Sequence, residues 1–97
     1  MLNPALETEL AKGLVIVGFG SPSCGACRMI APALQELSQK HSRKIIKVIP
    51  HQHRELANSY GIKYLPTLIK LVDGVETGRI IGKQSYSILD EFFAGDK

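Results

Sequence analysis

The sequence has only two cysteines, no long apolar run and little excess charge of either sign. Two cysteines cannot build a disulfide scaffold, so the 44% of hydrophobic residues must supply the core. No segment is apolar enough to span a membrane, and residues 1–12 lack the apolar stretch of a signal peptide. The net charge of +3 is small and its basic residues are dispersed, which argues against nucleic-acid binding. We therefore expect one cytoplasmic domain, residues 1–97.

The two cysteines lie three positions apart in Cys24-Gly-Ala-Cys27, between an apolar strand candidate (residues 14–19) and a helical pattern (residues 27–40). At the start of a helix this spacing brings the two Cα atoms to about 5–6 Å, where a disulfide closes without large strain. Unpaired N–H groups at the helix start favour a thiolate, and cysteine pKa values in such motifs fall to roughly 3.5–7.5. The pattern predicts that Cys24 attacks a disulfide and that Cys27 resolves the mixed disulfide.

Two other interpretations of the cysteine pair remain open from spacing alone. The pair could form half of a zinc site completed by His41, His51 or His53, although these histidines do not follow zinc-knuckle spacing. It could instead form a structural disulfide, but a bridge closing so short a loop restrains the unfolded chain little. A redox pair fits better, and Gly25, which has no Cβ, would let backbone approach it closely.

The rest of the chain alternates helical and strand patterns. The expected elements are a helix opened by Asn3 and Pro4, a buried strand at 14–19, a helix at 27–40 kinked at Pro32, a buried strand at 44–49, a helix at 54–60, strands at 67–72 and 75–81 joined by a tight turn, and a helix capped by Ser85 with an apolar stripe of Ile88, Leu89, Phe92 and Phe93. This order, αβαβαββα, predicts an α/β domain of three layers, α/β/α, around a central mixed sheet of four strands.

Several motifs together resemble the thioredoxin family over nearly the whole chain. They are Cys24-Gly-Ala-Cys27, Arg28-Met-Ile-Ala-Pro32, Tyr60-Gly-Ile62, Leu65-Pro66-Thr67, Asp73-Gly74 and Gly82. The resemblance implies the thioredoxin fold and a protein-disulfide reductase that acts through its dithiol and needs no cofactor or metal. It also implies a monomer that reduces disulfide-containing proteins and is itself reduced by a flavoenzyme of the thioredoxin-reductase type.

The family resemblance further implies a substrate-docking turn at Pro66. In the family the matching proline is cis and lies against the dithiol, and the backbone of the preceding residue, here Leu65, pairs with an extended substrate segment. The proline pattern alone would instead favour a trans proline at the start of an edge strand. The residues expected to contact substrate are Gly25, Ala26, Leu65, Pro66, Thr67 and Gly82.

Departures from the family concern proton transfer and partner choice. Where thioredoxins usually read Asp-Phe-Trp-Ala-x-Trp-Cys, this chain reads Gly18-Phe-Gly-Ser-Pro-Ser-Cys24. The family's buried aspartate, which accepts the proton of the resolving cysteine, is replaced by Gly18, so the proton of Cys27 must pass to water or another group. Losing a positioned base can lower the rate about 10²–10⁴-fold. Ser23 replaces an apolar platform, which should change the partners that dock. Lys47 matches a buried family lysine near the dithiol, or is a solvated strand residue.

These departures keep two alternative functions in view. The first is a thioredoxin-fold binding or regulatory module with little turnover, and the second is a glutaredoxin-like protein that takes electrons from glutathione. Gly25 stands where the glutaredoxin motif has proline, and the helix at residues 29–32 is thioredoxin-like. Because both thiols and the cationic helix start are retained, we expect the reductase.

Overall fold

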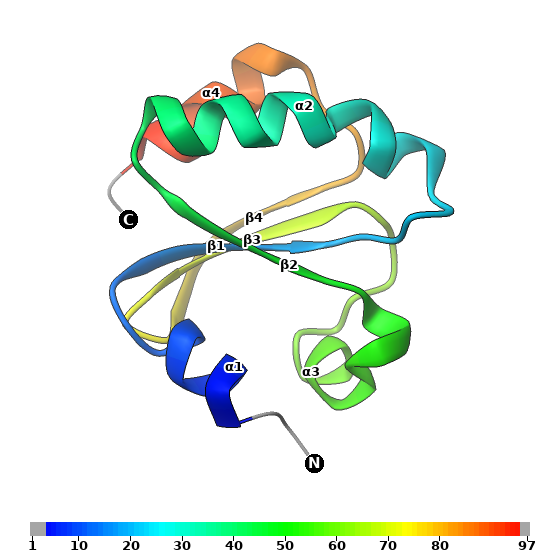
Figure 1. Ribbon diagram of the computed structural model, residues 1–97, viewed down its shortest axis with the longest axis vertical. Helices are drawn as coiled ribbons and strands as arrows, with labels where there is room; N and C mark the ends of the chain where they lie inside the picture. The colour runs from blue at the N-terminus through cyan, green and yellow to red at the C-terminus, as the bar shows by residue number, and fades with distance from the viewer. Residues whose placement is uncertain (1–3, 96–97) are drawn as a thin grey trace.

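The computed structural model describes residues 4–95, which form a four-stranded sheet with helices on both faces (Figure 1). The helices α1 and α3 cover one face, and α2 and α4 lie side by side on the other (Figure 1). The elements are α1 Pro4–Leu10, β1 Leu14–Phe19, α2 Gly25–Lys40, β2 Lys44–Val48, the 3₁₀ turn η1 Pro50–Gln52, α3 Arg54–Ser59, β3 Thr67–Val72, β4 Val75–Ile81 and α4 Tyr86–Ala94. Asn3, the expected cap of the first helix, lies outside the described residues.

The strands follow the order β2-β1-β3-β4, and the sheet is mixed, as the sequence predicts. Strand β1 is parallel to β2 and antiparallel to β3, which is antiparallel to β4. The parallel pair needs a crossover, which α2 supplies. The hairpin needs a tight turn with positive φ at both central residues, and Asp73 (φ 50°) and Gly74 (φ 86°) provide it. The expected three-layer α/β/α thioredoxin fold is therefore confirmed.

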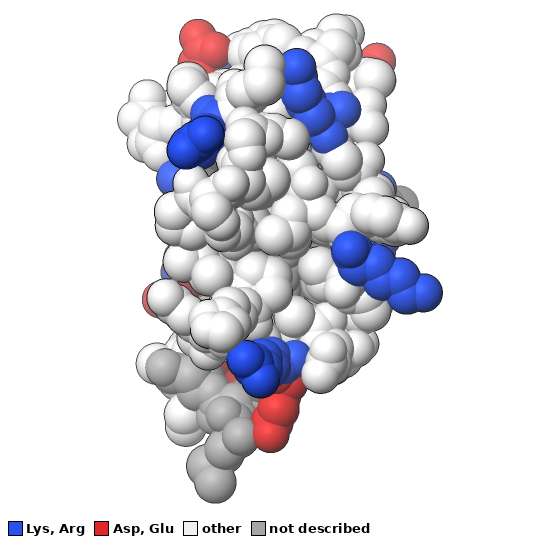
Figure 2. All heavy atoms as spheres, turned by 90° about the vertical axis from the view of Figure 1, so that its right-hand side faces the viewer, with Lys and Arg blue, Asp and Glu red and all other residues white. Residues whose placement is uncertain are grey.

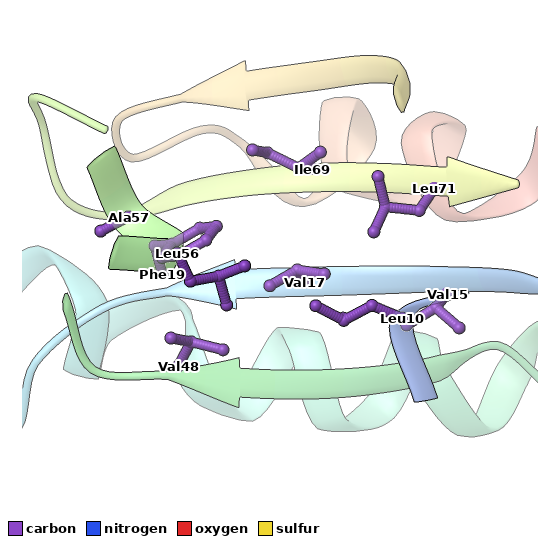
Figure 3. Close-up of a cluster of buried hydrophobic side chains, with 9 residues drawn as sticks. All are labelled: Leu10, Val15, Val17, Phe19, Val48, Leu56, Ala57, Ile69 and Leu71. Carbon is purple, nitrogen blue, oxygen red and sulfur yellow. The ribbon is translucent and has the colours of Figure 1, made fainter. Parts of the chain in front are cut away.

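Strand β1 lies at the centre of the core, because its side chains alternate between two apolar clusters. The cluster beneath α1 and α3 contains Leu10, Val15, Val17, Phe19, Val48, Leu56, Ala57, Ile69 and Leu71 (Figure 3). The cluster beneath α2 and α4 contains Ile16, Ile30, Leu34, Leu37, Leu68, Leu89 and Phe93. A strand buried on both faces needs an unbroken apolar run, which explains residues 14–17. Gly18 faces the α2 side, since a Cβ there would meet Leu68 and Ile45.

The second strand differs from the expectation of a buried strand over residues 44–49. Strand β2 is an edge strand that ends at Val48, and Val48 is its only buried residue, while Ile45 and Ile46 are half-buried. The next segment turns into η1 at Pro50, which lacks the N–H that a strand ladder requires. An apolar run alone cannot distinguish an edge strand from a central one when the edge is partly covered by helices.

Helix boundaries also shift by one or two residues. Helix α2 begins at Gly25 rather than at Cys27, because Cys24 is its N-cap residue. The helix continues through Pro32. Helix α3 ends at Ser59, before the positive φ of Gly61 (64°). In α4 the expected cap is present: Ser85 Oγ accepts a hydrogen bond from the Ile88 N–H at 3.3 Å. The side chain of Ile88 is exposed and lies outside the core, unlike Leu89 and Phe93.

Candidate active site

The two cysteines lie at the junction between β1 and α2. Cys24 is the last residue of the loop that follows β1, and Cys27 is in the first turn of α2 (Figure 1). Cys24 is the N-cap residue of α2, with φ −86° and ψ 114°, and both cysteines are half-buried free thiols. The loop is held by hydrogen bonds from the Gly20 N–H to the Val48 carbonyl and from the Cys24 N–H to the Ser21 carbonyl, each 3.0 Å. The Sγ of Cys24 accepts a hydrogen bond from the Cys27 N–H at 3.2 Å.

The two thiols have opposite electrostatic surroundings. The pKa of Cys24 is lowered, first by the hydrogen bond from the Cys27 thiol and then by the Cys27 N–H; the Ala26 N–H and the charge of Arg28 add to this. The pKa of Cys27 is raised, first by burial and then by its hydrogen bond to Cys24 and the charge there. The opposite pKa shifts mean that Cys24 loses its proton before Cys27 does.

The expected docking turn lies directly beside Cys24. The Leu65–Pro66 peptide bond is cis, so the trans alternative is wrong for this structure. The Leu65 carbonyl oxygen lies 3.9 Å from Cys24 Sγ. Leu65 is half-buried, whereas Pro66 is buried. The backbone of Leu65 is therefore next to the sulfur that a substrate disulfide must reach.

Hydrogen bonds hold the docking turn in place from both sides. The Gly82 N–H donates to the Pro66 carbonyl at 2.7 Å, and Gly82 adopts a φ of 83°, which an L side chain rarely adopts. The Thr67 hydroxyl donates to the Tyr64 carbonyl at 2.6 Å, and Thr67 is only 2% exposed. A buried hydroxyl with a short hydrogen bond restrains the turn more firmly than an exposed one. Gly25 and Ala26 lie at the start of α2, and a Cβ on Gly25 would meet open space.

Of the two alternatives for Lys47, the structure shows the solvated strand residue, because its side chain is exposed. It lies directly opposite Gly18 in the parallel pairing of β1 with β2. The edge position of β2 leaves its side chain accessible to water, and Gly18 offers no carboxylate to draw it inward. Lys47 nonetheless lines the same cavity as Cys27.

A cavity of about 290 Å³ opens between β1, the first half of α2 and β2. It is lined by Gly18, Phe19, Gly20, Ser21, Pro22, Cys27, Arg28, Ile30, Ala31, Leu34, Lys47, Val48, Ile49, Pro66 and Leu68. Gly20 lets the cavity reach Cys27, because a Cβ there would lie 3.1 Å from Cys27 Sγ. The sequence analysis identified Gly18 but missed Gly20 and Arg28 as parts of this space. The sequence signal that could have indicated this cavity is the pair of glycines on either side of Phe19, Gly18 and Gly20.

The face of the molecule around the cysteine loop is largely uncharged, with Lys and Arg side chains spread around it (Figure 2). Acidic side chains lie away from the centre of this view (Figure 2). Three large exposed apolar side chains, Met29, Tyr64 and Ile81, are close in sequence to Cys27, Leu65 and Gly82 respectively.

The zinc alternative lacks a set of ligands in residues 4–95, where no three His, Cys, Asp or Glu side chains gather to hold a metal ion. His41 Nε2 lies 2.6 Å from Asp90 Oδ1, and His51 Nδ1 lies 3.4 Å from an Arg54 nitrogen, so each has another neighbour. Among the same described residues, no helix combines the length and apolar character needed to cross a membrane.

Comparison with known proteins identifies the family. The family model named Thioredoxin matches residues 3–94. The chain belongs to the thioredoxin family. It is 36% identical over 91 residues to a thioredoxin of Bacillus subtilis, an alignment that covers 92% of this chain and 88% of the relative. As a member of this family with its cysteine pair in place, the chain is a thiol–disulfide oxidoreductase that reduces protein disulfides.

Solved structures agree with this assignment. The reduced thioredoxin pre-protein of Schistosoma mansoni superposes with a TM-score of 0.84 at 32% identity, covering 94% of this chain and 89% of that one. A mutant thioredoxin of Halobacterium salinarum gives a TM-score of 0.86 at 23% identity, over 96% and 83% of the two chains, and supports the fold alone. Family membership favours the reductase over the binding module and the glutaredoxin-like protein that the sequence analysis kept open.

Proposed function

We propose that Cys24 is the nucleophile and Cys27 the resolving thiol of this reductase. The observation that carries the assignment is the hydrogen bond from the Cys27 N–H to Cys24 Sγ at the start of α2. It stabilises a thiolate on Cys24, and the cysteine that is already ionised reacts first. Cys27 keeps its proton longer because burial raises its pKa, so it is held in reserve for the second step.

The reaction proceeds through two thiol–disulfide exchanges. The Cys24 thiolate attacks one sulfur of the substrate disulfide, and the other substrate sulfur leaves as a thiolate that is then protonated. Cys27 loses its proton and attacks Cys24 Sγ, and the first substrate sulfur leaves as the second thiolate. The substrate gains two electrons and two protons, and the chain is left with a Cys24–Cys27 disulfide.

Substrate recognition uses the docking turn. The exposed edge of the Leu65 backbone pairs with an extended segment of the substrate, and Pro66 sets the direction of that edge. Thr67 and Gly82 support the position of the turn, and their hydrogen bonds to Tyr64 and Pro66 favour this role. Gly25 and Ala26 lie on the other side of Cys24 and leave room for the approaching chain; the open space at Gly25 supports this.

Proton transfer from Cys27 passes through the cavity. Within residues 4–95 no carboxylate lines this space, so water takes the proton when nothing else is bound there, and the ammonium group of Lys47, on the border of the space, favours the Cys27 thiolate. A water acceptor is a weaker base than a positioned carboxylate, which makes the resolving step the slow one near neutral pH.

The wider setting of the reaction follows from the family. The partners are disulfide-containing proteins and a flavoenzyme of the thioredoxin-reductase type that returns the electrons. The chain acts as a monomer in the cytoplasm, with residues 1–97 as one domain. Half-burial of both thiols leaves them within reach of both kinds of partner.

An insulin-reduction assay with dithiothreitol as the electron source tests these roles, and Cys24→Ser should abolish turnover in it. When the reduced Cys27→Ser variant is mixed with insulin in the absence of dithiothreitol, it should stop after one event and trap a mixed disulfide on Cys24 that mass spectrometry detects. Lys12→Gln, an exposed change next to α1, is the matched control and should keep full turnover. Trapping on Cys27 in a Cys24→Ser variant would reverse the two roles.

A further inference from the structure

The cavity next to Cys27 is apolar over most of its wall. Six of the residues that line it are aliphatic or aromatic: Ile30 and Leu34 of α2, Leu68 of β3, Ile49 after β2, and Phe19 and Val48, whose side chains belong to the cluster on the opposite face of the sheet. Its floor is Gly18, whose missing side chain leaves the space above Leu68 and Ile45 unfilled. An apolar cavity of about 150 Å³ is large enough to hold benzene. A cavity of about 290 Å³ therefore has room for a ligand with an apolar body of some six to ten heavy atoms.

The charges around the cavity are all of one sign. Arg28 and Lys47 are the charged residues that line it, both are exposed, and neither forms an ion pair with another residue in the range 4–95. The first turn of α2, which contributes Cys27 and Arg28, adds the positive end of a sixteen-residue helix. No Asp or Glu lines the space. A ligand with one negative charge and an apolar body complements both properties of the site.

The third property of the cavity is chemical, because Cys27 forms part of its wall. The pKa of Cys27 is raised, and the resolving step needs its proton removed. The residues that line the cavity supply no base for this step. A bound anion that is also a Brønsted base would lie next to Cys27 Sγ and could accept its proton. Among small anions with apolar bodies, carboxylates combine both abilities.

We propose that this cavity binds a small aliphatic or aromatic monocarboxylate, and that the bound carboxylate accepts the proton of Cys27. The proposal rests on the function proposed above. The carboxylate takes the proton from Cys27 Sγ and becomes the carboxylic acid while Cys27 attacks Cys24 Sγ. The departing substrate thiolate then receives a proton, from the acid directly or through water, which regenerates the carboxylate. The ligand is unchanged at the end of each cycle and supplies no electrons.

Single-turnover kinetics with hexanoate test the catalytic part. Reaction of the reduced chain with dipyridyl disulfide places a thiopyridyl group on Cys24, and release of the second thiopyridone reports the attack by Cys27. At constant pH below the Cys27 pKa and at constant ionic strength, we expect hexanoate to raise this rate saturably, by about tenfold. Hexanamide, which has the same size and no basic carboxylate, should leave the rate unchanged. A rate that rises linearly, and equally with acetate, would mean base catalysis from bulk solution and would overturn the proposal.

Binding is measured separately by titrating the ¹⁵N-labelled reduced chain with hexanoate. We expect the amide signals of Gly18, Gly20 and Cys27 to shift together and to saturate. Ala31→Leu, which places a larger side chain on the cavity wall, should abolish the shifts, and Lys47→Gln should weaken binding about threefold, as for an exposed ion pair. Lys12→Gln, at the opposite end of β1, is the control that should bind as the unmodified chain does. Shifts that survive in Ala31→Leu would place the ligand elsewhere.

The two proposals fail in different ways. If the chain reduces insulin without added carboxylate but hexanoate neither binds nor accelerates the second step, the site is overturned and the reductase mechanism stands. If hexanoate binds without accelerating the second step, the proton-accepting role is overturned. If no second thiopyridone is released under any condition, the assignment of Cys27 as the resolving thiol falls first.

Discussion

The two sides of the dithiol are built in opposite ways. On one side the docking turn is closed: Pro66 is buried, its carbonyl accepts a 2.7 Å hydrogen bond from Gly82, and Thr67 bonds to Tyr64 at 2.6 Å. On the other side, next to Cys27, a cavity of about 290 Å³ separates the first half of α2 from the paired strands β1 and β2. The proposed recognition side is held by local hydrogen bonds, whereas the proposed proton-transfer side is left unfilled.

This contrast shows that the two halves of the reaction do not need equal preorganisation. A nucleophile and a docking edge must be held in place before the substrate arrives, because misplacement weakens every later step. A proton can be passed through mobile water, at the expense of rate. The following changes should break or sharpen the contrast, from the largest expected effect to the smallest.

The largest effect should come from filling the open side with a base through Gly18→Asp. The new carboxylate would point towards the α2 face, into the cavity that Cys27 borders. We expect the resolving step at neutral pH to become about a hundredfold faster, while burial of the carboxyl lowers the free energy of unfolding by about 1–3 kcal/mol. Rapid-mixing measurement of the second thiol release gives the rate. Gly18→Asn has nearly the same shape and no base, so an equal acceleration by Asn would exclude proton transfer as the cause.

The second effect concerns the order in which the two thiols ionise. The lowered pKa of Cys24 should make it react with iodoacetamide below the pH at which ordinary cysteine reacts, and the raised pKa of Cys27 should delay its reaction to higher pH. Mass spectrometry after brief alkylation across a pH series follows each site. Cys27→Ala removes the largest cause of the lowered pKa, so the Cys24 profile should move to higher pH. An unchanged profile would assign the shift to the backbone N–H groups instead.

A third, smaller effect tests the closed side through Gly82→Ala. A Cβ there meets no atom within 4 Å, so its effect comes from the φ of 83° alone. We expect the free energy of unfolding to fall by about 1–2 kcal/mol, measured by urea denaturation. Gly25→Ala is the matched control, because its Cβ also meets open space and no positive φ is involved, and it should change stability by less than about 0.5 kcal/mol. Equal losses in the two variants would contradict the argument.

The smallest effect distinguishes the two glycines of the open side. A Cβ at position 20 would lie 3.1 Å from Cys27 Sγ, whereas one at position 18 would lie 3.4 Å from Leu68 Cδ2, an ordinary contact. We expect Gly20→Ala to lower the free energy of unfolding by less than about 1 kcal/mol and to slow alkylation of Cys27, and Gly18→Ala to do neither. Urea denaturation and timed alkylation measure the two quantities. Slower alkylation in both variants would show that access to Cys27 depends on the volume of the cavity rather than on direct contact of the added Cβ with Cys27 Sγ.

The elements of the fold could be predicted from the chain because each rests on local periodicity. The apolar run of β1, the turn at Asp73-Gly74 and the cap at Ser85 are short-range signals, and the structure contains all three. The prediction was wrong or left open where the packing of neighbouring elements decides the outcome. How far β2 is buried and whether Lys47 is buried depend on which elements cover that strand, and no residue of β2 encodes this by itself.

By itself, the sequence determined the dithiol, its place at the start of a helix and the alternation of elements, because spacing and residue type are local properties. The missing carboxylate at Gly18 came from the sequence as well, but only through its resemblance to the thioredoxin family. Only the tertiary structure decided that Gly18 and Gly20 open one continuous space next to Cys27, with Lys47 and Arg28 on its border. A cavity is bounded by segments far apart in the chain, so its existence depends on how β1, β2, β3 and α2 pack and not on any one of them.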